Sequence, residues 1–335
     1  MSTQPSSNSV LLTVRDLEVD IALDASTVHA VRRIAFDVSA GEMIGIVGES
    51  GCGKSMTALS LLGLSREIPG AKVSGSIFFH PRKKDALKQL DLVHASFSEL
   101  KRIRGNEISM VFQDPMSSLN PVFTIGYQIM EPLLLHRGMS RRQAQREAVR
   151  LIHTVGIPDP EQRFNHFPHQ LSGGMRQRVM IAMALSCQPS LLIADEPTTA
   201  LDVTIQAQIL SLLLKLKNDL GAAIILITHN LSIAAGTCSR ILVMYAGRIV
   251  EETTTQEFFA APHHPYSRAL IASLPRADER RKLTSIAGQP PDLTIQLDGC
   301  AYAERCTRAD ELCKQKDPEL TSIDNGRAAC HHSYV

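Results

Sequence analysis

The chain has 335 residues, more than one average domain, and 44% of them are apolar while only 4% are aromatic, so it can bury a large core. A formal net charge of +1, dispersed along the sequence, gives no electrostatic basis for binding nucleic acid. No stretch approaches the roughly 18 uninterrupted apolar residues of a membrane helix, and the N-terminus lacks the order of a signal peptide. We therefore expect a cytoplasmic protein that reaches a membrane only by docking.

The N-terminal part predicts a tail followed by strands. Residues 1–10 are mostly polar and uncharged, and we expect them to form a short disordered tail. From about Leu11 to Val47 apolar residues alternate with polar ones, as in 34–38, which is typical of antiparallel strands packed on one face. The run Met43–Val47 is entirely apolar or glycine and predicts a buried strand.

Residues 48–55 match the phosphate-loop pattern G-x-x-x-x-G-K-[ST] at every position. The loop consists of Gly48, Glu49, Ser50, Gly51, Cys52, Gly53, Lys54 and Ser55. It lies between the predicted strand and an apolar run at 56–62 that predicts a helix, which is the context this motif requires. Its glycines let backbone N–H groups face an anion, and the helix dipole adds a positive end. We expect Lys54 to reach the β- and γ-phosphates of a nucleotide and Ser55 to ligate Mg²⁺.

The middle of the chain predicts helices. A charged stretch from about Arg82 to Arg104 links the first part to Gln113, which precedes Asp-Pro. From about residue 124 the pattern becomes helical, first at 125–135 and then after Ser140, a plausible helix cap. We expect a helical subdomain at about 124–175.

A second predicted anion-binding element is the stretch Ser172, Gly173 and Gly174, which precedes a helical pattern running to Leu185. Glycines allow close backbone approach, and a helix N-terminus attracts phosphate. Because the phosphate loop already supplies a complete site, this second element has no occupant within its own subunit.

Two carboxylates, Asp195 and Glu196, end the apolar run 191–194, which predicts another buried strand. Ligands of open α/β folds bind at the carboxyl edge of the parallel sheet, so Asp195 is placed to hold Mg²⁺. Glu196 would lie just outside the metal shell and could accept a proton from the attacking water, while the metal and Lys54 stabilise the developing charge.

The order of these motifs resembles the ABC-type ATPases, whose Leu-Ser-Gly-Gly signature precedes an apolar strand ending in Asp-Glu. The resemblance implies an α/β P-loop NTPase core of the RecA-like type, with an antiparallel β subdomain and a helical subdomain. It implies that Gln113 senses the Mg²⁺-nucleotide, that His229 contacts the γ-phosphate, and that the loop with Asp202 crosses to a partner subunit. Ser172–Gly174 would close on the ATP of that partner in a head-to-tail pair.

Two further segments, 113–121 and 263–270, resemble the ATPase subunits of oligopeptide, dipeptide and nickel importers. The likeness implies an ATPase domain at 11–262 and an importer-type C-terminal region at 263–335. It also implies a homologous second ATPase, two transmembrane permeases and an external solute-binding protein as partners, with the chain peripheral to the cytoplasmic face of the inner membrane. We expect ATP-driven uptake of dipeptides or oligopeptides.

Three other readings of the function stay open at this stage. The same motor could serve nickel or another small solute, because the specificity pocket lies in other chains. A soluble ABC ATPase acting on DNA or ribosomes typically carries two cores or a long coiled-coil insertion, and this sequence has neither. A regulatory subunit without hydrolysis is opposed by the intact catalytic residues.

One departure from the family concerns adenine stacking, since the chain offers Val28 or His29 where many members have an aromatic residue.

Four of the seven cysteines, Cys300, Cys306, Cys313 and Cys330, lie near the C-terminus. In a reducing compartment such a set indicates metal ligands rather than disulfides. Their spacing is wider than that of the usual zinc ribbon and does not choose the metal, because thiolates suit both Zn²⁺ and iron–sulfur clusters. The resemblance implies a [4Fe–4S] cluster. Zinc, with His331 and His332 as additional ligands, and the absence of any metal are the alternatives.

Overall fold

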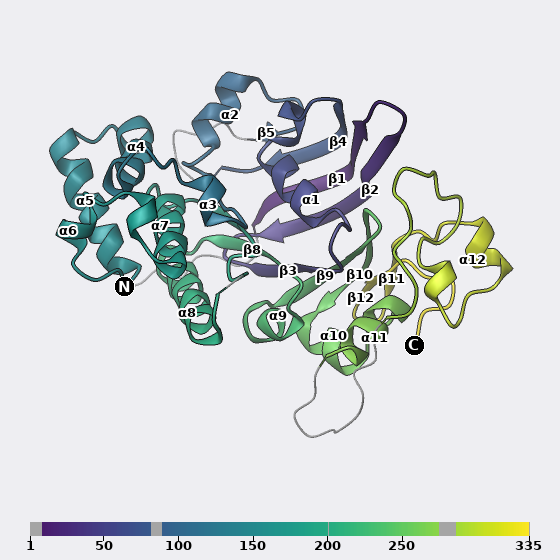
Figure 1. Ribbon diagram of the computed structural model, residues 1–335. Coiled ribbons are helices and arrows are strands. Elements are labelled where there is room, and N and C mark those ends of the chain that lie inside the picture. The colour runs from purple at the N-terminus through teal and green to yellow at the C-terminus, as the bar shows by residue number, and fades with distance from the viewer. Residues whose placement is uncertain (1–8, 82–88, 200, 275–285, 335) are drawn as a thin grey trace.

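The computed structural model describes residues 9–81, 89–199, 201–274 and 286–334. The tail predicted at 1–10 lies almost entirely outside the described residues, and Val10 already belongs to the first strand. Figure 1 shows two sheets at the centre of the molecule, helices α4–α7 on one side and the C-terminal segment with α12 on the other.

The larger sheet has eight strands in the order β11-β12-β10-β9-β3-β8-β7-β6. Its parallel part comprises β3 (Met43–Val47), β6 (Ile108–Val111), β7 (Leu191–Asp195), β8 (Ala223–Thr228) and β9 (Arg240–Tyr245). These strands are the continuous apolar runs of the sequence because helices or the second sheet cover both faces. Val47 pairs with Thr228 and Asp195 with Ile227, so the carboxyl ends of β3, β7 and β8 lie at one edge.

The antiparallel end of this sheet joins the C-terminal region to the core. Strand β10 (Arg248–Thr254) pairs with β9 and with β12 (Gly326–Ala328), and β12 pairs with β11 (Thr321–Ile323). The C-terminal segment thereby supplies two strands to the sheet that carries the nucleotide motifs.

The second sheet has the order β2-β1-β4-β5 and is antiparallel throughout. It comprises β1 (Val10–Ala22), β2 (Thr27–Ser39), β4 (Ala71–Phe79) and β5 (Leu90–Asp91). Its inward residues Val14 and Phe36 belong to the same buried cluster as Ile44 and Ile225 of the larger sheet. The alternating pattern therefore correctly predicts antiparallel strands that pack against the core.

The helical subdomain contains the predicted helices. It comprises α3 (Pro115–Ser118), α4 (Ile125–Arg137), α5 (Arg141–Thr154), α6 (Pro160–Arg163), the 3₁₀ turn Pro168–Gln170 and α7 (Gly173–Leu185). Ser140 caps α5 in a capping box with Gln143, as the sequence indicates. The charged stretch predicted as a link also contains structure, since β5 and α2 (Phe97–Ile103) lie within it.

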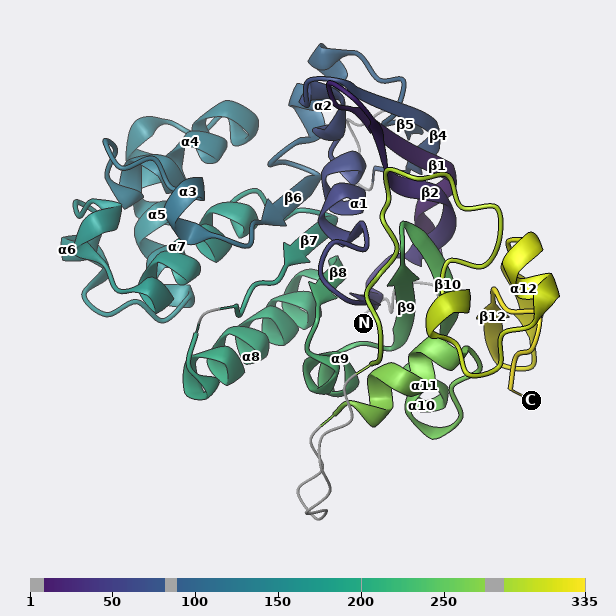
Figure 2. The same ribbon diagram turned by 45° about the vertical axis from the view of Figure 1, so that its right-hand side comes forward.

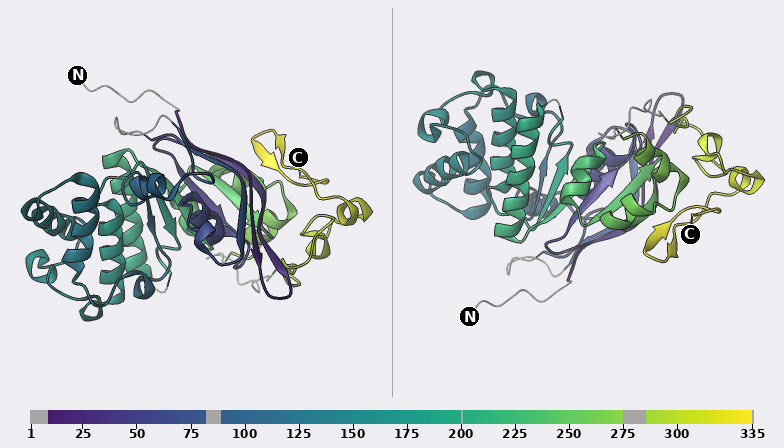
Figure 3. Two further views of the ribbon diagram at one scale, coloured as in Figure 1. Left: turned by 90° about the horizontal axis from the view of Figure 1, so that it is seen from above. Right: turned by 90° about the horizontal axis from the view of Figure 1, so that it is seen from below.

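The remaining helices and 3₁₀ turns lie outside the helical subdomain, some beside the parallel strands and some, such as α12, in the C-terminal segment. They are α1 (Lys54–Leu61), the 3₁₀ turn Ser65–Glu67, α8 (Val203–Leu220), α9 (Leu231–Thr237), α10 (Thr255–Ala260), α11 (Pro265–Ala272), the 3₁₀ turn Ala303–Arg305 and α12 (Glu311–Gln315). In Figures 2 and 3 the yellow C-terminal segment runs beside β1 and β2, away from α4–α6. Within the ranges that the structure describes, no helix is long and apolar enough to cross a membrane.

Candidate nucleotide site

The phosphate loop joins β3 to α1, and its glycines are required by close approach. A Cβ atom at Gly48 would lie 2.2 Å from the carbonyl oxygen of Met244, and one at Gly53, where φ is 101°, would lie 2.4 Å from that of Ala30. The loop curls around Lys54, whose Nζ donates hydrogen bonds to the carbonyls of Gly48 (2.9 Å) and Glu49 (2.8 Å). The amine is therefore held at the mouth of the loop, at the N-terminus of a helix.

Asp195 ends β7 beside the phosphate loop. Its carboxyl is buried near Ser55, and Oδ1 has no hydrogen-bond partner among the described residues. Burial raises the pKa of this carboxyl above its usual range, the charge of Glu196 raises it further, and Ser55 and Lys54 oppose the shift. A buried carboxylate oxygen without a partner, beside a serine hydroxyl, is a donor set that fits Mg²⁺.

Glu196 is surrounded by three polar side chains, of which Thr199 is three residues away in the sequence and Gln113 and His229 are distant. Its Oε2 accepts hydrogen bonds from Gln113 Nε2 (3.0 Å) and Thr199 Oγ1 (2.8 Å), and its Oε1 lies 3.1 Å from His229 Nδ1. Burial raises the pKa of the Glu196 carboxyl, but the hydrogen bonds from His229 and Thr199 and the charges of His229 and Lys54 outweigh it, so the net pKa is lowered. Glu196 is thereby kept ionised at neutral pH.

The backbone at Glu196 is strained, because φ is +45° at a residue with a side chain. A conformation of this kind costs on the order of 1–3 kcal/mol and persists where the surrounding structure imposes it. Here the N–H of Glu196 donates to the carbonyl of Ile227 in β8 at 2.9 Å, which fixes the turn after β7. The turn aims the carboxylate toward Gln113 and His229.

The signature residues lie apart from this group. Ser172 caps α7 by accepting from the N–H of Met175, and a Cβ added to Gly173 would meet no described residue within 4 Å beyond its chain neighbours and its own helix backbone. Asp202 caps α8 by accepting from the N–H of Ile205. Within the described part of the chain, no hydrogen bond joins Ser172 or Gly173 to the phosphate loop. The structure thus brings Gln113, Asp195, Glu196 and His229 together, and leaves the signature and Asp202 exposed on another surface.

The four C-terminal cysteines line one small cavity. Cys300, Cys306, Cys313 and Cys330 share it with His264, His331 and His332. A smaller candidate group, in which Asp310, Cys313 and His332 each offer an atom within 4.8 Å of the others, overlaps it. Burial raises the pKa of Cys300 to about 11, and the neighbouring Cys330 and Cys313 add to the shift. Among the described residues, the group close enough to share one ion is Asp310, Cys313 and His332, while the four thiols share the lining of the cavity.

Sequence reasoning missed a contact between this cysteine-rich region and the phosphate loop. Arg305 makes two hydrogen bonds to the Glu49 carboxylate, NH1 to Oε2 at 2.7 Å and NH2 to Oε1 at 2.9 Å. The N–H of Glu49 also donates to the hydroxyl of Tyr266 at 2.9 Å. Tyr266 belongs to the segment 263–270 that resembles the importer ATPases, but nothing in the sequence of that segment indicates which residue it contacts.

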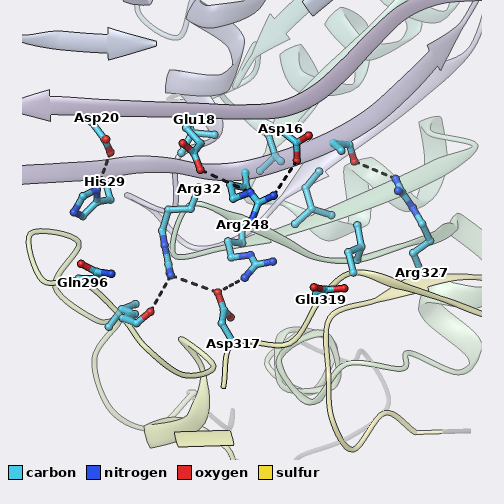
Figure 4. A pocket seen from close by; sticks show the side chains of 17 residues that line it. Asp16, Glu18, Asp20, His29, Arg32, Arg248, Gln296, Asp317, Glu319 and Arg327 are labelled. Carbon is cyan, nitrogen blue, oxygen red and sulfur yellow. Dashed lines mark hydrogen bonds and ion pairs between the residues drawn. The ribbon is translucent and has the colours of Figure 1, made fainter. Parts of the chain in front are cut away.

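The expected adenine-side residue His29 has other partners. Its Nδ1 lies 2.7 Å from Asp20 Oδ1, and its N–H donates to the carbonyl of Leu293. It lines a cavity of about 730 Å³ between β1, β2 and the C-terminal segment. Figure 4 shows that Arg32 and Arg248 converge there on Asp317, so that ion pairs join the C-terminal segment to β2 of the antiparallel sheet and to β10 of the larger sheet.

Two families match different parts of this chain. The ABC transporter family matches residues 31–199, and the oligopeptide/dipeptide transporter C-terminal region matches residues 250–313. Together they cover the phosphate loop, the signature, the strand ending in Asp-Glu, and much of the C-terminal region, including Arg305.

Relatives and solved structures agree with these matches. A probable peptide ABC transporter ATP-binding protein of Sinorhizobium fredii is 49% identical over 98% of this chain and 96% of its own length. The oligopeptide transport ATP-binding protein OppD of Salmonella typhimurium is 47% identical (96% and 93%), and the dipeptide transport ATP-binding protein DppD of Escherichia coli is 44% identical (96% and 96%). A bacterial ABC transporter cassette solved as a dimer superposes with a TM-score of 0.64 at 27% identity, over 73% of this chain and 99% of that one.

With the phosphate loop, the Asp-Glu strand end and the signature in place, and with relatives matching over nearly its whole length, this chain belongs to the ABC transporter ATPases that carry the oligopeptide/dipeptide transporter C-terminal region.

Proposed function

We propose that this chain is the ATP-hydrolysing motor subunit of a peptide importer. The observation that carries the proposal is the convergence of Gln113, Glu196 and His229 next to Asp195 and the phosphate loop. A carboxylate kept ionised beside a predicted metal site is suited to polarise water for attack on a γ-phosphate. The peptide substrate class comes from the relatives, which are peptide, oligopeptide and dipeptide transport ATP-binding proteins.

Within this proposal each site residue has a role. The phosphate loop from Gly48 to Ser55 cradles the phosphates of ATP, with Lys54 on the β- and γ-phosphates. Ser55, Gln113 and Asp195 hold Mg²⁺, which neutralises the phosphate charge. Glu196 accepts the proton of the attacking water, and His229 orients that water against the γ-phosphate.

The proposed partner at the ATP site is a second, homologous ATPase. In this arrangement Ser172, Gly173 and Gly174 close on the phosphate of the partner's ATP, and the loop of Asp202 crosses the interface. Open space at Gly173 supports this assignment, because no contact within the described chain requires a glycine there. ATP binding would then favour the closed pair and hydrolysis would release it.

The proposed docking surface for the permeases is the exposed apolar group Met116, Val122, Phe123 and Tyr127, which follows Gln113 in the chain. Met116 and Val122 are 65% and 71% exposed, and Phe123 stacks on Tyr127 with ring centroids 4.8 Å apart. Clustered exposed apolar side chains of this kind mark protein interfaces. Through Gln113, this surface would communicate with the catalytic carboxylate.

A charge placed on this surface tests the assignment. Val122→Asp is expected to leave nucleotide hydrolysis by the paired ATPase subunits without permeases unchanged and to lower ATP-driven uptake by the assembled transporter at least about fivefold, as loss of an interface anchor does. The matched control is Leu312→Asp on α12, which also puts a carboxylate on an exposed leucine (46%). Equal uptake by the two variants would show that the permeases contact a different surface of the chain.

The solute is tested with the complete transporter. With its permeases and binding protein in vesicles, dipeptides and longer peptides should stimulate ATP hydrolysis, whereas nickel should not. Stimulation by nickel alone would favour the metal-import alternative. Because the proposal has the chain working from the cytoplasmic face of the membrane, ATP should act only when supplied on the side where the chain is bound.

For the C-terminal region we propose a [4Fe–4S] cluster held by Cys300, Cys306, Cys313 and Cys330, with zinc as the alternative. The four thiols line one cavity, which supports a shared metal centre. The cluster would supply a structural crosslink, because a short polar segment has little core of its own. We place the region that it stabilises at 263–335 and the ATPase domain at 11–262.

Anaerobically purified protein is accordingly expected to contain iron and acid-labile sulfide and to absorb broadly in the visible range. Cys306→Ser should remove both and loosen the segment from about 290 to 335, since one of four ligands is lost. Limited proteolysis and metal analysis measure the two effects. Stoichiometric zinc without sulfide would show that the cysteines form a zinc site and not a cluster. Protein without any metal would show that the cysteines hold no metal.

A further inference from the structure

Glu49 of the phosphate loop is held by the C-terminal region from two directions. The guanidinium of Arg305 grips its carboxylate with two hydrogen bonds, and the Tyr266 hydroxyl accepts its backbone N–H. Arg305 and Glu49 lie 256 residues apart in the chain. A third contact of Glu49 lies within the phosphate loop itself, where the Glu49 carbonyl accepts a hydrogen bond from Lys54 Nζ.

The Arg305 side chain is buried in this position and does not lie on the surface. Its side chain is only 4% exposed, and the hydrogen bonds to Glu49 hold the pKa of its guanidinium above the usual range. NH1 also donates to the Tyr245 hydroxyl at 3.1 Å, and Nε donates to the carbonyl of Ala287 at 2.9 Å. A buried guanidinium with paired, two-pronged geometry is rigid, and it leaves the Glu49 carboxylate little freedom.

The tyrosines around Arg305 stiffen the same contact. Tyr245, Tyr266 and Tyr302 are nearly or fully buried, and their ring centroids lie 4.6–5.3 Å from one another. Tyr245 ends β9 in the ATPase core, whereas Tyr302 precedes Arg305 in the cysteine-rich segment. The ring cluster therefore ties the two parts of the chain together directly behind the phosphate loop.

We propose that Arg305 and Tyr266 are positioning residues for ATP binding, and that they act through Glu49 on Lys54. The Glu49 carbonyl is one of the two protein oxygens that orient the Lys54 amine, so fixing Glu49 fixes where that amine meets the phosphates. A preorganised loop binds its ligand more tightly because less ordering remains to be done on binding. The inference rests on the proposed ATP hydrolysis by this chain and does not depend on which solute is imported.

The test measures ATP hydrolysis and nucleotide affinity in the full chain. Arg305→Gln and Tyr266→Phe should each raise KM for ATP about three- to tenfold and weaken binding of a fluorescent ATP analogue in parallel, while kcat at saturating ATP changes less than about twofold. Arg305→Lys, which keeps the charge but not the two-pronged geometry, should fall between the wild type and Arg305→Gln. Adding Glu49→Gln to Arg305→Gln should cause little further loss, because both changes break one pair.

Two matched variants separate positioning from general damage. Lys314→Gln removes a charge from the same region, where Lys314 pairs with exposed Glu311. Tyr302→Phe removes a hydroxyl from the same ring cluster, and among the described residues Tyr302 makes no hydrogen bond to the phosphate loop. Both should keep the KM of the wild type.

The proposal is overturned if Arg305→Gln and Tyr266→Phe keep a normal KM, or if Lys314→Gln raises KM equally. A fall in kcat at unchanged KM would also contradict it. Should Arg305→Gln fail to fold, Tyr266→Phe decides the question, since it preserves the packing of the ring and removes only the acceptor of the Glu49 N–H.

Discussion

Glu196→Gln is expected to bind MgATP normally and to lose turnover by about 10²–10⁴-fold, the usual contribution of a positioned general base. The amide keeps the shape of the side chain, but it cannot take the proton of the attacking water. It also replaces one carboxylate oxygen by a donor, next to Gln113, Thr199 and His229, all of which now approach the carboxylate. The assembled transporter should therefore accumulate in the closed state with nucleotide trapped.

Steady-state hydrolysis and nucleotide retention measure this outcome. Glu67→Gln, which makes the same change at an exposed carboxylate paired with Arg104 and outside the Glu196 group, offers a comparison in which the nucleotide site stays intact. Near-normal turnover by Glu196→Gln would show that Glu196 is not the general base. His229 would then be the next residue to test for that role.

Ser172→Arg is expected to spare nucleotide binding by this chain and to disable hydrolysis at the site whose phosphate loop belongs to the partner. A large side chain in a closed interface costs on the order of 1–3 kcal/mol or more, equivalent to roughly 5- to 150-fold in the closed population. Gly173→Ala is a sharper companion, because its methyl group would meet no described atom of this subunit within 4 Å apart from its chain neighbours and its own helix backbone. Any loss that it causes must therefore arise between subunits.

Hydrolysis at the two sites can be separated by inactivating one phosphate loop at a time. The head-to-tail arrangement predicts that Ser172→Arg acts on the partner's site alone. Failure restricted to the phosphate-loop site of the mutated chain would contradict that arrangement.

Much of the fold was predictable because its signals are local. The apolar run Met43–Val47 coincides with β3, and Ser140 caps α5 through a box that spans four consecutive residues. The helix α2 also carries a local signal, a capping box between Ser96 and Glu99, which the charge of the surrounding stretch conceals. Periodicity and capping depend on neighbours in sequence, so they can be read without tertiary information.

The site was predictable only where motifs mark it. Gln113, Glu196 and His229 were identified by their order along the chain, and the geometry brings them into contact. No sequence motif indicates the hydrogen bonds between Arg305 and Glu49, because they depend on how a distant segment folds back over the core. The identity of the metal at the cysteines was also not predictable. The reason here is that thiolate spacing alone does not distinguish zinc from iron.

The hairpin β11–β12 has a consequence for self-association. Without it, β10 would end the large sheet with unpaired N–H and C=O groups, the usual template for sheet-to-sheet aggregation. Strand β12 covers Glu251–Thr253, and β11 leaves an outer edge only three residues long, Thr321–Ile323. The C-terminal segment therefore does more than carry cysteines: it shields the nucleotide-binding sheet from adding a foreign strand, which protects the protein from polymerising through its own core.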